Sequence, residues 1–233
     1  VNRVFVEGAL VAEEGKYLPE IKKCDISSVK GSVIVKDFSK EKFKMNLKSN
    51  KVNVIKILPG GVVTAKDTAE IELDANGEFV RNPEVDLVKV AVVERHQGTG
   101  NVACGFLKGY GIKEGAVALS VAHDSHNIIV VGVNDEEMEF AVNSLIEQEG
   151  GIVLVKEGKV IESMPMPIAG LMSDQSGEWV DQKLTDIHEK AYEELGICGD
   201  VEPVMTLCFM SLAVIPEIKL TDMGLFDVTT FSF

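Results

Sequence analysis

The sequence predicts an α/β to α+β fold, in which a mixed β-sheet packs against helices and short strands precede it. Two nearly continuous β-branched runs, 87–93 and 128–133, have the composition of strands that are buried on both faces. Two amphipathic patterns, at 134–149 and 176–195, predict long helices that alternate with such strands. Glycine-bearing turns between short strands indicate hairpins, which favour a mixed sheet.

The beginning of the chain differs from the rest. Residues 4–18 are expected to form short strands, because Glu14-Gly15 follows alternating apolar residues in the pattern of a hairpin. Residues 19–32 have little periodicity and predict an irregular connection, and 36–51 is polar and rich in lysine. We therefore divide the chain into two units, 1–45 and 46–233.

The second unit is expected to begin with a strand at 52–58. The nearly continuous apolar runs that follow predict further buried strands at 87–93, 116–121, 128–133 and 152–155. The last of these reaches 160–161 through the turn 156–159. The pair Asn76-Gly77 suits a two-residue turn with positive φ.

The two helices have recognisable ends. Asn134 is expected to cap the first helix, with Glu137 completing a capping box, and Gly150-Gly151 to end it. The second helix is expected from about Ser176 to Leu195, where a glycine follows. His188 lies at the edge of its apolar face and is interpreted as structural.

Charge excludes two classes of partner. The 233 residues include 23 Lys and Arg and 37 Asp and Glu, a net charge of −14. Nucleic-acid binding needs clustered cations, so no nucleic-acid partner is expected, and docking on an anionic membrane is disfavoured for the same reason. The longest apolar run, 128–133, is far shorter than the roughly 20 residues that span a bilayer.

Cysteine usage and the first residues suggest the setting of the chain. Its four cysteines are scattered and form no Cys-x-x-Cys pair, which fits a reducing cytoplasm better than a disulfide framework or a zinc site. The chain starts at Val1 in a strand-like alternation, without an initiator methionine or a signal peptide. We expect it to be a piece of a longer chain.

The most informative segment is a polar run between two apolar strands, which contains His123, Asp124, Ser125, His126 and Asn127. Such side chains at the mouth of a buried strand are unfavourable unless they have a function. In an extended segment they would point alternately to two sides and could offer donors and acceptors to the edge of a heterocycle. The alternative is a satisfied polar turn, with Asp124 capping its own backbone.

A second candidate follows the central strand. Glu94 and His96 precede a glycine-bearing loop, and charged residues at the end of a parallel strand lie where open α/β sheets place their sites. The alternative is a solvated strand end with a Glu94–Arg95 ion pair. The apolar, proline-spaced run 164–174 either walls a pocket for a flat ligand or fills the core.

Metal ligation within the chain is not expected. His123 and His126 are spaced like two ligands on a helical turn, but a third ligand is missing and the segment leads directly into a strand. Catalytic zinc sites need about three protein ligands and structural sites about four.

Three motifs connect the chain with a known family: Val93-Glu94-Arg95-His96, Ala122-His123-Asp124-Ser125-His126-Asn127, and the run from Pro165 to Asp174. They closely resemble the C-terminal part of bacterial-type adenine deaminase, in the amidohydrolase superfamily. Further similarity lies at 109–111, 134–135, 205–207 and 214–222, so the resemblance extends over essentially the whole chain.

The resemblance implies a particular architecture. In that family a small β-sandwich is interrupted by a metal-binding (β/α)₈ barrel and followed by a C-terminal α/β domain. Residues 1–45 would then be the returning sandwich strands and a connection, and 46–233 the C-terminal domain. The barrel, with its binuclear manganese or iron centre, is outside this chain, so the chain alone is expected to bind no metal and to be inactive.

The resemblance also implies an activity: hydrolysis of a cyclic amidine C–N bond, which converts adenine to hypoxanthine and ammonia in purine salvage in the cytoplasm. The resemblance does not assign roles to single residues, and it is our own inference that residues 123–127 complete or cover the purine pocket. Glu94 and His96 are further candidates for substrate binding. The expected partners are adenine, the missing barrel segment and further copies of the chain. The alternative is a stand-alone α/β module that has a binding or structural role without catalysis.

Overall fold

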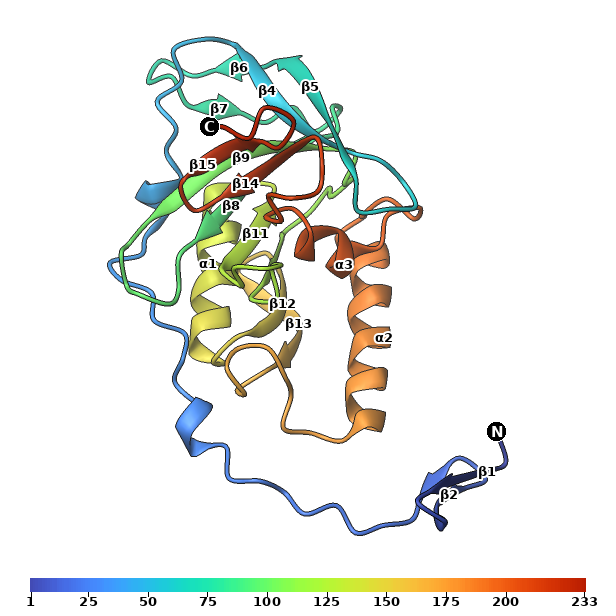
Figure 1. The fold of residues 1–233 in the computed structure, drawn as a ribbon. Helices are drawn as coiled ribbons and strands as arrows, with labels where there is room; N and C mark the ends of the chain where they lie inside the picture. Colours follow the sequence, from blue (N-terminus) through green and yellow to red (C-terminus); the bar gives the residue numbers. More distant parts are fainter.

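The computed structural model describes residues 1–233, and a mixed eight-stranded sheet forms its centre (Figure 1). Across this sheet the strands follow one another in the order β13 (Lys159–Pro165), β12 (Gly151–Lys156), β10 (Ala116–Leu119), β11 (Ile128–Gly132), β8 (Leu87–Val93), β9 (Val102–Lys108), β4 (Lys51–Ile57) and β5 (Thr64–Glu70). Helix α1 (Asp135–Glu147) covers one face, and α2 (Gly177–Glu193) and α3 (Pro203–Cys208) cover the other. The predicted fold class is confirmed.

Neighbouring strands of this sheet are antiparallel except for one parallel pair, β4 and β9. Strand β8 is therefore antiparallel to both of its neighbours, β11 and β9. The expectation that Glu94 and His96 follow a parallel strand is wrong. A long apolar run indicates burial on both faces, which an antiparallel strand also has when both of its faces are covered, as those of β8 are.

Alternate side chains of β8 enter two different cores. Val90 and Val92 pack on the side of α2 and α3, together with Ile187 and Leu207. Ala91 and Val93 pack on the other side, in the core that α1 shares. Because successive side chains of a strand point to opposite faces, every residue of β8 is buried and every one is apolar except Lys89. The Lys89 ammonium donates to Asp135 at 2.7 Å.

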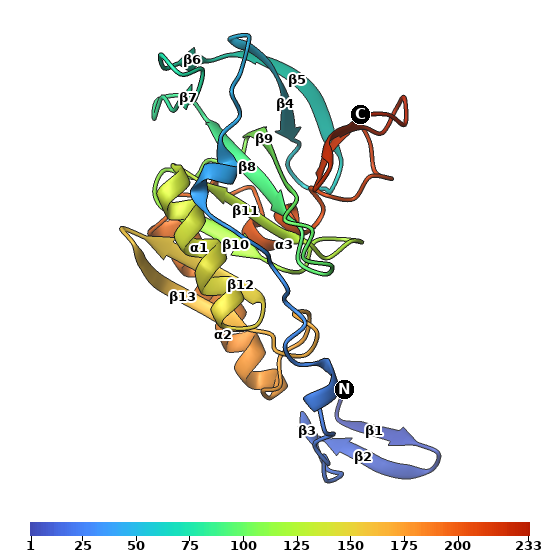
Figure 2. The same cartoon turned by 90° about the vertical axis from the view of Figure 1, so that its left-hand side faces the viewer.

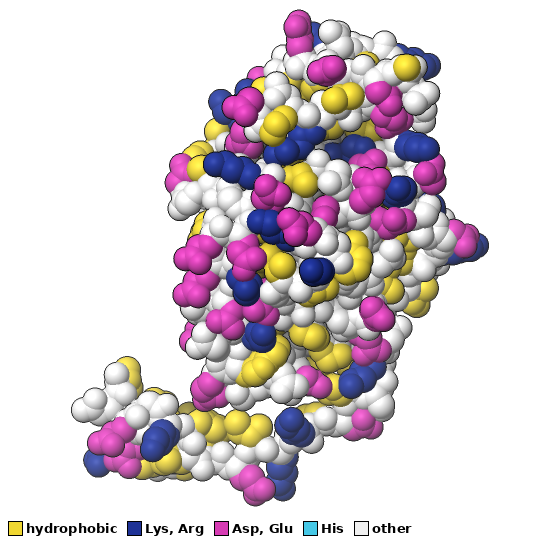
Figure 3. All heavy atoms as spheres, turned by 180° about the vertical axis from the view of Figure 1, so that it is seen from behind, with side chains coloured by type: hydrophobic (Ala, Val, Ile, Leu, Met, Phe, Trp, Pro, Cys, Tyr) yellow, Lys and Arg dark blue, Asp and Glu magenta, His cyan; other side chains and the backbone are white.

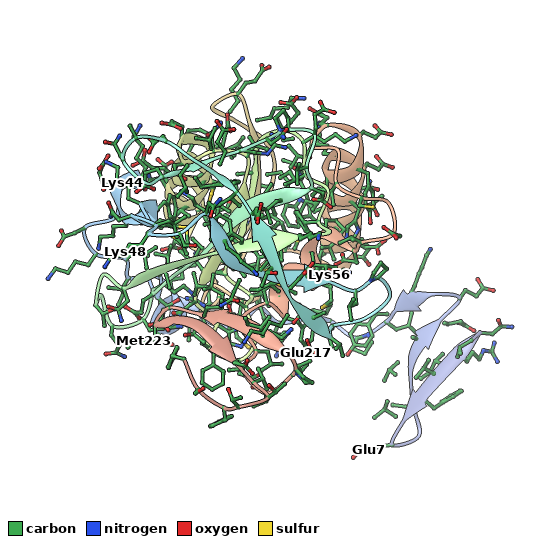
Figure 4. All side chains as sticks on the ribbon, turned by 90° about the horizontal axis from the view of Figure 1, so that it is seen from above. Glu7, Lys44, Lys48, Lys56, Glu217 and Met223 are labelled. Atoms are coloured by element: carbon green, nitrogen blue, oxygen red, sulfur yellow. The ribbon has the colours of Figure 1, made fainter.

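The N-terminal strands stand apart from this unit (Figure 2). They form a three-stranded antiparallel sheet from β1 (Arg3–Val6), β2 (Ala9–Glu13) and β3 (Lys16–Tyr17). The predicted hairpin at Glu14-Gly15 is confirmed, and both residues of that turn have positive φ. Glu7, in the other turn, lies far from the labelled Lys44 and Met223 (Figure 4).

The apolar side chains of this small sheet have no core of their own. Phe5 is 60% exposed and Tyr17 is 61% exposed, and apolar atoms are open along this end of the molecule (Figure 3). An extended connection, with short 3₁₀ turns at Ser27–Val29 and Lys40–Phe43, then joins the α/β unit. Within it, Val33 and Phe43 pack into the core that α1 shares, so the end of the 1–45 segment contacts the second unit.

Local signals set the helix ends. The Asn134 side chain accepts a hydrogen bond from the Glu137 N–H at 2.8 Å, which confirms the predicted cap of α1. The predicted reciprocal bond of a capping box does not form, because the Glu137 carboxylate instead accepts from the Gly158 N–H at 3.1 Å, in the β12–β13 turn. Ser176 caps α2 by accepting from the Trp179 N–H at 3.2 Å.

Two small sheets complete the structure: β6 (Glu72–Leu73) with β7 (Phe79–Val80), and β14 (Ile218–Thr221) with β15 (Gly224–Asp227). Between β6 and β7 only Gly77 has positive φ, and its N–H donates to the Asp74 carbonyl at 3.1 Å. The Asp74 N–H also donates to the Glu78 carbonyl at 2.9 Å, so the loop between these paired residues contains three residues, Ala75 to Gly77, and the prediction of a two-residue turn is wrong. No helix is long and apolar enough to cross a membrane.

The cap of α1 can be tested by substitution. Replacing Asn134 by Ala leaves the Glu137 N–H without its acceptor, and we expect the free energy of unfolding to fall by about 1 kcal/mol. Urea unfolding followed by circular dichroism measures this change. Asn143→Ala, at an exposed position within the same helix, is the matched control and should not lower stability. Equal losses in the two variants would contradict the capping role.

Candidate functional site

The polar run 122–127 forms a compact turn between β10 and β11, which we call the histidine turn. It is closed by the His126 N–H, which donates to the Ala122 carbonyl at 2.6 Å, and His126 has a φ of 53°. The segment is therefore not extended, and the alternating two-sided row of side chains is a wrong expectation. A backbone hydrogen bond closes the turn, and Asp124 does not.

The side chains of the histidine turn differ in exposure. Asp124 and Ser125 are exposed, and His123 and His126 are half-buried. The His123 ring packs against Phe209, with centroids 4.8 Å apart, and edge-to-face against His126 at 5.5 Å. These four side chains are the ones that a ligand could reach, because Asn127 is only 4% exposed.

Buried Arg95 holds the histidine turn from inside. Its Nε donates to the His126 carbonyl at 2.5 Å and its Nη2 to the Ala169 carbonyl at 3.2 Å. The Asn127 Oδ1 accepts from the Arg95 backbone N–H at 3.3 Å. Asn127 therefore supports the turn. No carboxylate pairs with the guanidinium, so the alternative of a Glu94–Arg95 ion pair is wrong.

Glu94 organises the loop that follows β8. Its Oε1 accepts from the backbone N–H groups of His96 and Gln97, at 2.5 and 2.7 Å. Its Oε2 accepts from the N–H and hydroxyl of Thr99, at 2.9 and 3.0 Å. Burial by itself would raise the pKa of Glu94, but these four donors outweigh it and lower that pKa to about 2. The carboxylate is ionised and fully occupied by its own loop.

His96 links this loop to the histidine turn. Its Nε2 lies 2.7 Å from the Ser125 carbonyl, and since a carbonyl only accepts, Nε2 carries the proton in this bond. The ring is otherwise exposed. The structure thus brings all seven predicted site residues together at one end of the central strands, where the loops that follow β8 and β10 leave the sheet (Figure 2).

The surroundings of His126 lower its pKa and so favour the neutral imidazole. Burial is the first cause of its lowered pKa, followed by the positive charge of His123 when protonated and by Arg95. Asp124 acts in the opposite direction, and His96 adds slightly to the lowering. A neutral imidazole can both donate and accept a hydrogen bond, which suits the recognition of an uncharged heterocycle.

The residues of this chain do not fit a catalytic metal centre. No group of three or more His, Cys, Asp or Glu side chains is placed to hold an ion. The edge-to-face packing of the His123 and His126 rings joins them to each other and brings no third ligand to them. The donor set required for a binuclear centre is therefore not provided by the histidine turn.

The main hollows of the chain lie away from the histidine turn. The largest, about 870 Å³, lies between the connection, at Ile21 and Cys24, and the start of α2, at Trp179. Ile168, Ser173 and Asp174 also line it, so the run 164–174 does border a hollow. Another, of about 510 Å³, lies beside the start of α1. Neither of these two hollows is lined by a residue of the histidine turn.

Two supporting residues are missing from the sequence-based site. One is Arg95, and the other is Ser120, whose hydroxyl donates to the Gly170 carbonyl at 2.5 Å and accepts from the Gly151 N–H at 2.7 Å. Each is a polar residue directly at or beyond the end of an apolar strand and is itself fully buried. A polar residue at the end of an apolar strand could have identified both residues from the sequence, because a buried polar group must find hydrogen-bond partners in another segment.

The chain matches the family model described as "Adenine deaminase C-terminal domain" over residues 61–232. It is 66% identical over 233 residues to adenine deaminase 2 of Desulfotalea psychrophila, covering 100% of this chain and 40% of that protein. It is 46% identical over 233 residues to adenine deaminase of Ligilactobacillus salivarius, with the same coverage. With adenine deaminase 2 of Carboxydothermus hydrogenoformans it shares 45% over 229 residues, 98% of this chain and 40% of that protein. The chain spans about 40% of the length of these curated relatives.

Glu94 makes the stability of the loop that follows β8 depend on pH. Because its folded pKa of about 2 lies below the ordinary value of 4.5, its contribution is complete above about pH 4.5 and is lost as the pH falls toward 2. We expect Glu94→Gln to lower the free energy of unfolding by about 1–3 kcal/mol at pH 7, and by progressively less in acid. Denaturant unfolding between pH 7 and pH 3 measures the difference.

Glu189→Gln is the matched control for this measurement. Glu189 is exposed on α2 and has no hydrogen-bond partner, so its stability difference from the wild type should stay near zero at every pH. A Glu94→Gln difference that does not shrink in acid would show that the ionised carboxylate is not what holds the loop.

Proposed function

The chain belongs to the adenine deaminase family, and from this premise we propose that it forms one part of an enzyme that hydrolyses adenine to hypoxanthine and ammonia. In this reaction water supplies the oxygen that replaces the amino group at C6, a C–N bond breaks, and ammonia leaves. The observation that supports a role for this chain is the histidine turn, a cluster of polar side chains that buried Arg95 holds in place.

The proposed task of the histidine turn is to bind the edge of the purine and to close the pocket over it. Adenine presents ring nitrogens that accept hydrogen bonds and an amino group that donates. Half-buried His126, kept neutral, and exposed Ser125 can complement either kind of group. A site built from such pairs rejects isosteres that leave a buried donor or acceptor unpaired.

The metal chemistry is assigned to the rest of the deaminase. The binuclear manganese or iron centre that the family resemblance implies would supply an activated water for the attack on adenine. The side chains of this chain do not form a ligand set for it, so we propose that its ligands come from the remaining part. We propose that the activity belongs to purine salvage in the cytoplasm, where a chain with four free cysteines is at home.

The N-terminal sheet supports an assembly with that remaining part. A three-stranded sheet is stable when an apolar face is covered, yet Phe5 and Tyr17, which the strand pairing puts on one face, are each about 60% exposed. We propose that the rest of the deaminase covers this face. Further copies of the assembled enzyme are the other proposed partner.

The role of His126 can be tested in the complete deaminase. His126→Asn removes the imidazole but retains a residue that tolerates the positive φ of this position. We expect kcat/KM for adenine to fall by about one to two decades, since one donor or acceptor of the substrate loses its partner. The melting temperature should change little.

His188→Asn is the matched control, because His188 is also half-buried but pairs with Glu202, at the start of α3, and makes no contact with the histidine turn in the hydrogen-bond network. It should leave kcat/KM within about twofold of the wild type. If His126→Asn lowers the melting temperature while kcat/KM stays unchanged, the histidine turn has a structural role only.

The assignment of the metal to the other part gives a separate prediction. The purified 233-residue chain should not deaminate adenine with added Mn²⁺ or Fe²⁺, since it lacks a suitable ligand set. Ammonia release measures the activity, and elemental analysis measures bound metal. Steady turnover, or about one metal ion per chain, would place the centre in this chain and contradict the proposal.

A further inference from the structure

We propose that Arg95 is the positioning residue of the histidine turn: its guanidinium joins the turn to the loop 166–172 and thereby fixes where the His126 ring stands. This inference deepens the proposed function and rests on it, because there the histidine turn meets the substrate. Arg95 itself is 1% exposed and cannot touch a ligand. It acts through His126.

The geometry of Arg95 supports a positioning role. The guanidinium donates two hydrogen bonds at once, from Nε to the His126 carbonyl at 2.5 Å and from Nη2 to the Ala169 carbonyl at 3.2 Å. The Arg95 backbone carbonyl accepts from the Ile34 N–H at 2.8 Å. A single residue thus connects three segments that are remote in the sequence: the N-terminal connection, the histidine turn and the loop 166–172.

The hydrogen bonds form a continuous path into the histidine turn. The Ala169 N–H donates to the Val29 carbonyl at 3.0 Å, and the Ala169 carbonyl accepts from Arg95, which in turn donates to His126. The guanidinium lies directly against Gly170, where an added Cβ would stand 2.8 Å from Nη1. Any side chain at position 170 would collide with the Arg95 guanidinium, so this position requires a glycine.

The chemistry of the contact argues against a role in stability alone. A buried guanidinium without a carboxylate is unfavourable, and well-packed apolar residues often stabilise a core better than buried charges. Nη1 is buried and has no hydrogen-bond partner. Buried Lys89, in contrast, has Asp135 as its counter-ion at 2.7 Å. What Arg95 does provide is a rigid, planar group that holds two carbonyls at fixed angles to each other, whereas the donors of a lysine ammonium rotate freely.

The test uses the 233-residue chain with Arg95→Lys and Arg95→Met. Amide hydrogen exchange at His126 and Ala169 reports whether the turn and the loop stay closed, and NMR titration of the His126 ring reports its surroundings. The groups facing that ring are His123, Asp124, His96 and Arg95. We expect exchange at both amides to be at least about tenfold faster in either variant.

Titration of the His126 ring separates the effect of the positive charge of Arg95 from the effect of its planar shape. In Arg95→Met the pKa of His126 should rise, because a nearby positive charge is removed. In Arg95→Lys the charge remains, so the amides should loosen with a smaller rise in this pKa. If Arg95→Met does not fold, Arg95→Lys alone provides the test.

Lys219→Met is the matched control. Lys219 is also a fully buried cation that donates only to a backbone carbonyl, that of Val62 at 3.0 Å, and it lies outside the histidine turn. Exchange at His126 and Ala169 that changes no more in the Arg95 variants than in this control would overturn the positioning role.

The same Arg95→Lys change in the complete deaminase separates this inference from the proposed function. A loosened turn together with a fall in kcat/KM of about tenfold supports both. A loosened turn with adenine turnover within about twofold of the wild type keeps Arg95 as the positioning residue but removes the histidine turn from the reaction.

Discussion

The burial of both faces of the central strands of the sheet, β12, β10, β11 and β8, is the constraint on which the rest of the structure depends. Helix α1 on one side and α2 with α3 on the other leave almost no position within the central strands for a polar side chain. Polar groups therefore lie at the strand ends, and many of them lie in the loops that follow β8 and β10. The candidate site thus lies in these loops because the buried core has almost no room for polar side chains.

Within these loops, the seven predicted residues divide by what they do. Glu94 and Asn127 are buried and satisfy backbone N–H groups, so they fix the shape of the two loops. His123, Asp124, Ser125 and His126 remain within reach of a ligand. His96 joins the loops through the Ser125 carbonyl. A polar cluster in a sequence thus contains both the groups that bind and the groups that hold them in place.

The sequence predicted what short-range signals determine and failed where distant partners decide. Both helices, the Asn134 cap and the buried strands follow from local periodicity and side-chain chemistry. The Glu94–Arg95 ion pair failed because the two side chains find different partners: Glu94 turns to its own loop, and Arg95 reaches Ala169, 74 positions further along the chain. Neither Gly170 beneath the guanidinium nor the loop 166–172 could be placed beside residue 95 from spacing alone.

The two kinds of strand in the sheet differ in how freely their residues can change. Every position of β8 is buried, whereas in the outer strand β5, beyond buried Thr64, half-buried and exposed positions alternate. A random substitution in β8 meets a packed core whichever face it points to, and most changes of volume or polarity there are destabilising. In β5 every second position faces solvent and accepts polar replacements. Mutational drift should therefore be strongly uneven across the sheet, least in β8 and greatest at the outer edge.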